Sequence, residues 1–133
     1  RKLEKLALDS APLPGATMQG IAISNGRLHA LEADPIEGWR VAGTIGSPIK
    51  KPILALALRA GRALVLDSIG AVHRLHSDTG KWDRPVVLTK DYYWKGLCLL
   101  PETNDFLALG RPKHEVGVRQ LWRFAPPDPW DPA

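Results

Sequence analysis

Residues 53–82 show the most regular alternation of hydrophobic and small or polar residues in the chain. Between Leu54 and Arg59, leucines alternate with alanines. A period of two predicts a β-strand, because successive side chains of a strand point to opposite faces. Pro52 before the run and Gly61 after it would leave a helix only about two turns, which is marginal in water. The pattern therefore favours a strand.

Two more strands are predicted in the same stretch. Residues 62–67 (RALVLD) resume an apolar run after the glycine turn, and residues 72–76 (VHRLH) follow a second turn at Gly70. Residues 77–80 (SDTG) then place Asp early and Gly late, which suits a hairpin loop built on a type I turn. The stretch thus predicts three short strands joined by tight turns.

The same succession of strand, tight turn and strand recurs along the chain. The three segments that can be superimposed are residues 21–31, 55–66 and 97–109. Each is followed by an aromatic residue or His, then Arg, then an apolar residue: Trp39-Arg40-Val41, His73-Arg74-Leu75 and Trp122-Arg123-Phe124. A unit of three or four strands that repeats about every 40 residues has the size of a propeller blade.

Residues 19–124 resemble the blades of β-propeller proteins, and residues 70–82 (GAVHRLHSDTGKW) are similar to the outer strand and turn of such a blade. The resemblance implies an all-β fold with about three blade-like antiparallel sheets that form part of a propeller. The expected units are residues 16–47, 52–91 and 92–125, followed by a proline-rich tail at 126–133. Residues 1–15 could form a short helix or a strand of another blade. A sandwich or a small barrel is the alternative, because propellers usually have four to eight blades.

This fold predicts almost no helix and a leucine core. The expected core residues are Leu56, Leu58, Leu64, Leu66, Leu99, Leu107 and Leu109. The repeated Trp39 and Trp122 are expected to be wedges between units. The repeated Arg40, Arg74 and Arg123 are expected to point away from that core.

Charge and composition limit the classes of partner that the chain is expected to bind. The net charge is +4, with 18 basic residues scattered among 14 acidic ones, and the only adjacent basic pairs are Arg1-Lys2 and Lys50-Lys51. A nucleic-acid partner needs a clustered basic stripe, so none is expected. No apolar run approaches the roughly 20 residues that span a bilayer, so no membrane partner is expected either. Cys98 is the only cysteine, which excludes an intrachain disulfide and leaves the compartment open.

No catalytic residue, metal site or cofactor is predicted. His73 and His76 are three residues apart, which places them on opposite faces of a strand and argues against a shared metal. Cys98 lies within an apolar run and is expected to be a buried small side chain rather than a nucleophile. No glycine pattern suits a phosphate.

The predicted binding residues are Tyr92, Tyr93, Trp94 and Lys95, together with His114 in the long loop of the third unit. Three consecutive aromatics in a strand must alternate between faces, so at least one ring faces outward. Such rings could form a stacking platform for a sugar or a peptide. The alternative is core packing with one exposed edge, and His114 could simply be a solvated loop tip.

The sequence favours a non-catalytic binding or scaffold module that interacts with other proteins. One alternative is a propeller hydrolase or lactonase whose site this chain supplies only in part, which acidic and Asn residues converging on a channel would indicate. The other is a lectin that closes its ring by oligomerisation, which equivalent surface aromatics in each unit would indicate. Because three blades do not close a ring and the chain begins at Arg1, we expect a longer polypeptide or a second copy to supply the rest.

Overall fold

The computed structural model describes residues 3–15, 18–77, 79–101, 103, 105–114 and 117–125. These residues form strands and turns, and the prediction of an all-β chain is confirmed. The strands are β1 (Leu3–Leu8), β2 (Gly20–Ser24), β3 (Arg27–Asp34), β4 (Gly38–Ile45), β5 (Ile53–Arg59), β6 (Arg62–Asp67), β7 (Ala71–His76), β8 (Val86–Val87), β9 (Tyr92–Leu99), β10 (Phe106–Pro112) and β11 (Gln120–Phe124). Among the residues described, no helix is long and apolar enough to cross a membrane.

The strands form three antiparallel sheets in which neighbours in space are neighbours in sequence. The first sheet has the order β1-β2-β3-β4, the second β5-β6-β7-β8 and the third β9-β10-β11. The segment that the sequence left open between helix and strand is β1, which pairs with β2 through partners such as Leu6 and Ala22. The prediction of three blade-like antiparallel sheets is therefore confirmed.

Two hairpins turn through residues with positive φ. Asn25 and Gly26 have φ values of 53° and 72°, and Ala60 and Gly61 have values of 50° and 74°. Two successive positive φ angles define the type I′ turn, for which Asn-Gly is the preferred sequence. Ala60 is unusual there, because the left-handed region of φ and ψ is about 1–2 kcal/mol less favourable for a residue that carries a Cβ atom.

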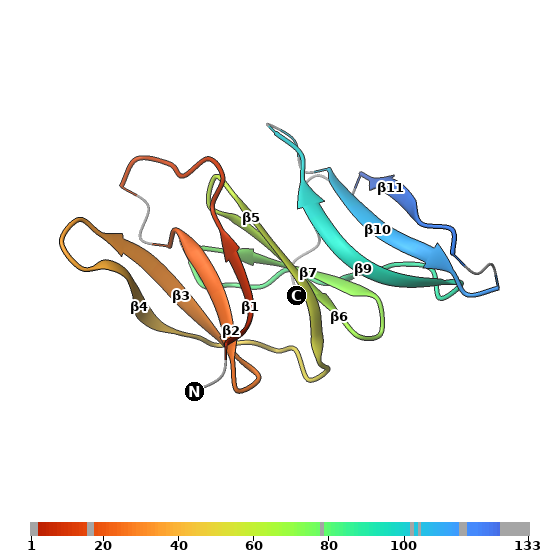
Figure 1. Ribbon diagram of the computed structural model, residues 1–133, viewed down its shortest axis with the longest axis horizontal. Helices are drawn as coiled ribbons and strands as arrows, with labels where there is room; N and C mark the ends of the chain where they lie inside the picture. The colour runs from red at the N-terminus through yellow and green to blue at the C-terminus, as the bar shows by residue number, and fades with distance from the viewer. Residues whose placement is uncertain are drawn as a thin grey trace.

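The three sheets stack face to face in sequence order, and the first strand of each lies at the centre of the stack (Figure 1). Strand β5 contacts β1 on one side and β9 on the other. Consecutive meander sheets whose first strands lie side by side have the arrangement of neighbouring propeller blades. The second sheet is therefore enclosed between the other two.

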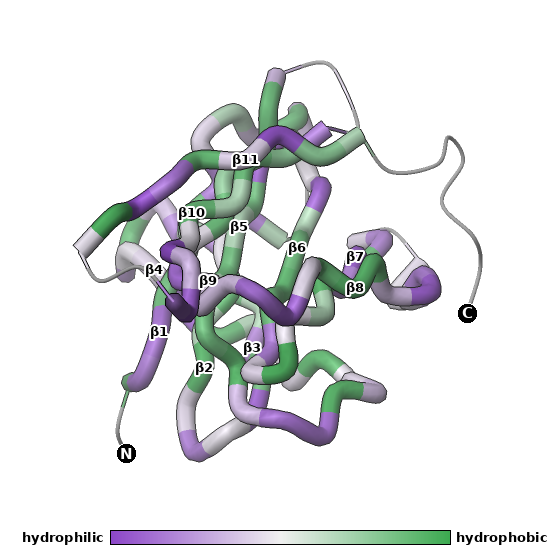
Figure 2. Tube along the Cα trace, turned by 90° about the vertical axis from the view of Figure 1, so that its right-hand side faces the viewer, coloured by the Kyte–Doolittle hydropathy of each residue, from purple (hydrophilic) through white to green (hydrophobic). Residues whose placement is uncertain are grey.

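Two apolar cores separate the sheets. The core between the first and second sheets contains Met18, Ile21, Ile23, Leu28, Leu58, Ala63 and Leu75. The core between the second and third sheets contains Ala55, Ala57, Leu64, Leu66, Val72, Leu88, Trp94, Leu99, Phe106 and Ala108. Strands β5 and β6 supply residues to both cores and are mostly apolar along their length (Figure 2).

Four of the predicted core leucines are buried: Leu58, Leu64, Leu66 and Leu99. Leu56, Leu107 and Leu109 are only half-buried. In β10 the buried side chains are Phe106 and Ala108, so the prediction chose the wrong face of this strand. Cys98 was also predicted to be buried and is exposed, on the same side of the third sheet as its partner Leu107.

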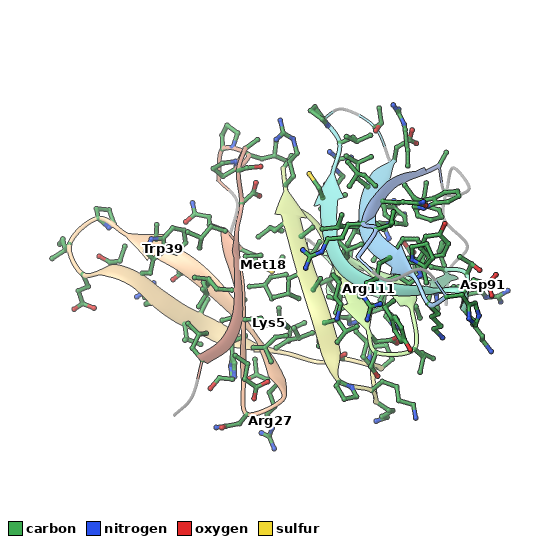
Figure 3. The ribbon with its side chains drawn as sticks, turned by 45° about the vertical axis from the view of Figure 1, so that its right-hand side comes forward. Lys5, Met18, Arg27, Trp39, Asp91 and Arg111 are labelled. Carbon is green, nitrogen blue, oxygen red and sulfur yellow. The ribbon has the colours of Figure 1, made fainter. Side chains whose placement is uncertain are left out.

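Trp39 is not a wedge between units, whereas Trp122 lies on the face of the third sheet that is directed toward the second sheet, beside Tyr92. Trp39 is 50% exposed on the last strand of the first sheet, and Trp122 is 43% exposed on the third strand of the third sheet. Figure 3 shows Met18 on the side of the first sheet that faces β5 and Trp39 on the other side. Because the two tryptophans occupy different strands of their sheets, the sequence superposition was offset by one strand in the first unit.

The repeated arginines form ion pairs within the chain. Each pairs with a carboxylate close to its own strand: Arg40 with Glu32, Arg74 with Asp83, and Arg123 with Asp105.

Asp9, just after β1, ties the first sheet to the second. Its carboxylate accepts hydrogen bonds from the backbone N–H groups of Ala60 and Gly61, at 2.8 and 2.9 Å, and also from Ala11 N at 2.9 Å. Arg59 donates to the hydroxyl of Ser10 at 3.1 Å beside it. The carboxylate thus satisfies the two amides that the left-handed turn directs toward the first sheet.

We predict that Phe106→Ala lowers the free energy of unfolding by about 3–5 kcal/mol, because it empties a fully buried site. The matched control is Leu107→Ala, the next residue along β10 on the opposite, half-exposed face, which should cost about 1 kcal/mol. Urea denaturation in dilute solution measures both. Equal costs would contradict the assignment of the Phe106 face to the core.

We predict that Asp9→Ala lowers the free energy of unfolding by about 1–3 kcal/mol, because two amides of the Ala60 turn lose their acceptor. Asp34→Ala is the control: its carboxylate also caps a turn, through Ile36 N and Glu37 N, but within one sheet and at an exposed position. Thermal unfolding of both variants provides the comparison. A smaller loss for Asp9→Ala than for Asp34→Ala would mean that the clamp between sheets contributes little.

Candidate binding site on the third sheet

The three consecutive aromatics at the start of β9 divide between the two faces of the third sheet. Tyr92 and Trp94 lie on the face toward the second sheet, stacked with their ring centroids 5.2 Å apart. Trp94 is 4% exposed and donates its indole N–H to the carbonyl of Thr89 at 3.0 Å, while the Tyr92 hydroxyl donates to Gln120 Oε1 at 2.7 Å. These two predicted binding residues are therefore engaged in packing and internal hydrogen bonds.

Tyr93 faces the other way, is 46% exposed and lies beneath two cations. The guanidinium carbon of Arg111 lies 4.7 Å from the centroid of the ring, and Lys113 Nζ lies 5.2 Å from it. Arg111 is the cross-strand partner of Tyr93, and Lys113 follows the end of β10. Cations over an aromatic face are attracted by the ring quadrupole, by about 0.5–1 kcal/mol at an exposed site.

Gly110 lies next to Arg111 in β10, on the face of the third sheet that is directed toward the second sheet, and Trp94 packs against it. A Cβ at this position would lie 2.7 Å from Cε3 of Trp94 and 3.1 Å from the carbonyl oxygen of Tyr93. The indole therefore packs directly on the glycine backbone. The register of β9 and β10 shifts at this point, so that Gly110 pairs with Trp94 and Leu109 with Gly96. The shift leaves Lys95 unpaired with any residue of β10.

The remaining predicted residues lie at the surface near this cluster. Lys95, in the register shift, and His114, next to Lys113, are both exposed. The backbone N–H of Lys113 donates to the carbonyl of Asp91 at 2.8 Å, which holds the β10–β11 loop against the start of β9. Arg111 and Asp91 both belong to this part of the third sheet (Figure 3). The structure thus brings Tyr93 together with Arg111 and Lys113, on the face of the sheet opposite to Tyr92 and Trp94.

Arg111 and Lys113 were missed by the sequence reasoning. Within the described part of the chain, neither of them forms an ion pair. The carboxylate of Asp91, whose backbone carbonyl accepts from Lys113 N–H, is exposed and accepts from the Thr89 hydroxyl at 3.4 Å. The sequence prediction ended this strand at Leu109 and placed both cations in the following loop, whereas β10 continues to Pro112 and so brings Arg111 onto the same side as Leu109.

Several ionisable side chains around β7 form internal pairs in the second sheet. Asp67 accepts from the N–H groups of Ile69 and Ala71 and lies 2.8 Å from Nε2 of His73. Asp83 pairs with Arg74 and with His76. The two histidines thus contact different carboxylates, and the described residues contain no cluster of three potential metal ligands.

Arg62 connects the second and third sheets by donating to the carbonyl of Leu100 at 3.0 Å. Burial, followed by the charges of Arg59 and Arg74, lowers the pKa of its guanidinium. At the exposed end of the first sheet, hydrogen bonds from the backbone of Glu37 and Ile36 lower the pKa of Asp34. Neither group is near Tyr93.

Comparison with known proteins gives structural likeness only. No family model and no curated protein matches the sequence. Among solved structures, the N-terminal domain of Nup159 has a TM-score of 0.44 at 14% identity. A chain in the S. cerevisiae complex of a Dbp5 variant with Nup159, a Gle1 variant, IP6 and ADP has a TM-score of 0.43 at 12% identity. Both alignments cover 96% of this chain and 32% of the solved chain, so this chain spans about a third of their length.

We predict that Gly110→Ala lowers the free energy of unfolding by about 1–3 kcal/mol, because the added methyl group displaces the Trp94 indole. The matched control is Gly43→Ala in β4, where the added Cβ would meet nothing within 4 Å. Urea denaturation followed by tryptophan fluorescence measures the loss. If the two variants are equally stable, the indole is not held against this glycine.

Proposed function

We propose that this chain is a non-catalytic binding module that binds an acidic segment of a protein partner. The observation that carries the proposal is the exposed Tyr93 ring with Arg111 at 4.7 Å and Lys113 at 5.2 Å. A carboxylate of the partner could accept from the guanidinium fork, and an apolar stem could lie along the ring. Lys95 and His114 would extend the same basic surface.

The distribution of charge supports an acidic partner. Elsewhere in the described residues, the repeated arginines already have carboxylate partners within the chain. Arg111 and Lys113 have cation–π contacts instead, which leave their N–H groups available. The resulting patch is short, whereas a nucleic acid would need a basic stripe along the surface. A protein segment with a few acidic residues fits it better.

The alternatives find less support. A propeller enzyme would direct acidic residues toward the centre of the stack, and the three first strands β1, β5 and β9 contain one carboxylate, Glu4. A lectin would show equivalent surface aromatics in each sheet. The exposed rings of Trp39, Tyr93 and Trp122 instead lie on the fourth, first and third strands of their sheets.

The test uses a short dye-labelled peptide of alternating Asp and Ser residues, with the corresponding Asn and Ser peptide as the control ligand. Fluorescence anisotropy should show binding of the Asp peptide that weakens as salt is raised. The double variant Arg111→Gln and Lys113→Gln should weaken it at least tenfold, because a charge-assisted hydrogen bond contributes about 1.5–3 kcal/mol.

The matched control is Lys81→Gln with Arg84→Gln, which removes two exposed cations of the second sheet. This variant should bind the Asp peptide as the unmodified chain does. Equal affinity for the Asp and Asn peptides would contradict the proposal. Binding of a single-stranded oligonucleotide through the same residues, in preference to the Asp peptide, would replace the protein partner with a nucleic acid.

A further inference from the structure

The first sheet has an apolar face that no described element covers. This outer face of the first sheet is formed by the exposed side chains of Leu3, Leu6, Leu8, Trp39 and Val41, which surround the buried Ala22 and Leu31. They line a groove of about 360 Å³. Ser24 opens onto the same groove, and its buried hydroxyl has no hydrogen-bond partner among the described residues. Contiguous apolar surface of this kind marks an interaction site.

The third sheet has a second such face, directed away from the second sheet. Leu107 is the cross-strand partner of Cys98, and Leu109 that of Leu121, so these four side chains share a side. Leu121 is 62% exposed, Cys98 is exposed, and the other two are half-buried. We call them the outer face of the third sheet. Arg123, the cross-strand partner of Leu107, lies on the same side and is paired with Asp105, so this face is apolar at its centre and charged at its edge.

The order of the sheets determines which faces fit each other. Within the chain, the first sheet packs against the second sheet, and the second sheet packs against the third. The outer face of the first sheet points toward the position that a preceding sheet would occupy, and the outer face of the third sheet points toward the position that a following sheet would occupy. The two outer faces therefore have the same relation to one another as the two faces that form each internal core. One chain cannot bring them together, but two chains can.

The area of contact favours using both faces at once. The third sheet limits each contact, because its three strands, about 4.8 Å apart and about six residues long, cover about 300 Å² and one face-to-face contact therefore buries about 600 Å² in total. That is the size of an incidental contact, whereas a stable complex buries about 1,600 Å². Two copies that pair the first-sheet face with the third-sheet face twice bury about 1,200 Å², the lower end of the range for stable complexes, which a single contact does not reach.

We propose that two copies of this chain associate about a two-fold axis, with the outer face of the first sheet of each copy against the outer face of the third sheet of the other. The assembly contains six sheets, which is within the range of four to eight blades in propellers. Tyr93, Arg111 and Lys113 are not needed for this contact, so the proposal is independent of the acidic partner.

The test is light scattering over a range of concentrations. The unmodified chain should be a dimer at tens of micromolar, and Leu6→Lys and Leu121→Glu should each raise the dimer dissociation constant at least about a hundredfold, since each places a charge in both contacts. Leu6 is 51% exposed and Leu121 is 62% exposed, so both variants should fold, which circular dichroism checks. Ile36→Lys, at a turn residue that is 93% exposed, should leave the dimer unchanged.

Mixing the two variants tests the head-to-tail arrangement. A heterodimer of Leu6→Lys with Leu121→Glu keeps one unmodified contact and places opposite charges in the other, so the mixture should recover dimer that neither variant forms alone. Cys98 provides a second readout, because its reaction with a thiol reagent should be slower in the dimer than in the Leu6→Lys monomer.

Three results would overturn the proposal. One is a stable monomer of the unmodified chain with a cooperative melt at the same concentrations. Another is a dimer that Leu121→Glu leaves intact, which would mean that the first-sheet faces pair with each other. The third is a mixture that remains monomeric, which would exclude the pairing of first face with third face. In none of these cases is the binding of the Asp peptide affected.

Discussion

The burial of both faces of the second sheet is the constraint on which the rest of the structure depends. A sheet covered on one side alternates apolar and polar residues, whereas a sheet covered on both sides must be apolar throughout. Strand β6 comes close to this condition, because its four central residues from Ala63 to Leu66 are apolar and buried, and the buried Asp67 at its end is paired with His73. The first and third sheets each cover one of these faces, and each keeps one apolar face free. The uncovered apolar surface on the first and third sheets therefore follows from the enclosure of the second sheet between them.

The sequence predicted the strands better than it predicted which way they face. Alternation around Leu56 and the glycine turns located β5, β6 and β7, because turn chemistry is local. In β10 both faces are apolar, with Phe106 and Ala108 on one and Leu107 and Leu109 on the other. Hydrophobicity alone cannot decide between them. Packing decides, because the Phe106 ring stacks on Phe124, with centroids 5.3 Å apart, within the core of the second and third sheets.

The candidate site could be predicted only in part, because it depends on the register between strands. The aromatic run at Tyr93 is visible in the sequence, but its partners Arg111 and Lys113 lie about twenty residues away. Pairing of β9 with β10, together with the shift at Lys95, brings them over the ring. The same shift places Gly110 under Trp94. A pattern read along one strand contains no information about such a shift, so the aromatic platform was expected to include Tyr92 and Trp94 as well.

Charge would limit the extent of the proposed contact between copies and would leave Tyr93, Arg111 and Lys113 accessible. Burying Arg111 and Lys113 without carboxylate partners would cost several kcal/mol for each ion. The apolar part of the third-sheet face lies at Leu107, Leu109 and Leu121, and Arg111 follows two residues beyond Leu109 along β10. A second copy therefore gains by covering the leucines and loses by covering the cations. The proposed contact would therefore end near Leu109, with Tyr93 and its cations at the rim, where the proposed acidic segment would reach them whether the chain is alone or paired.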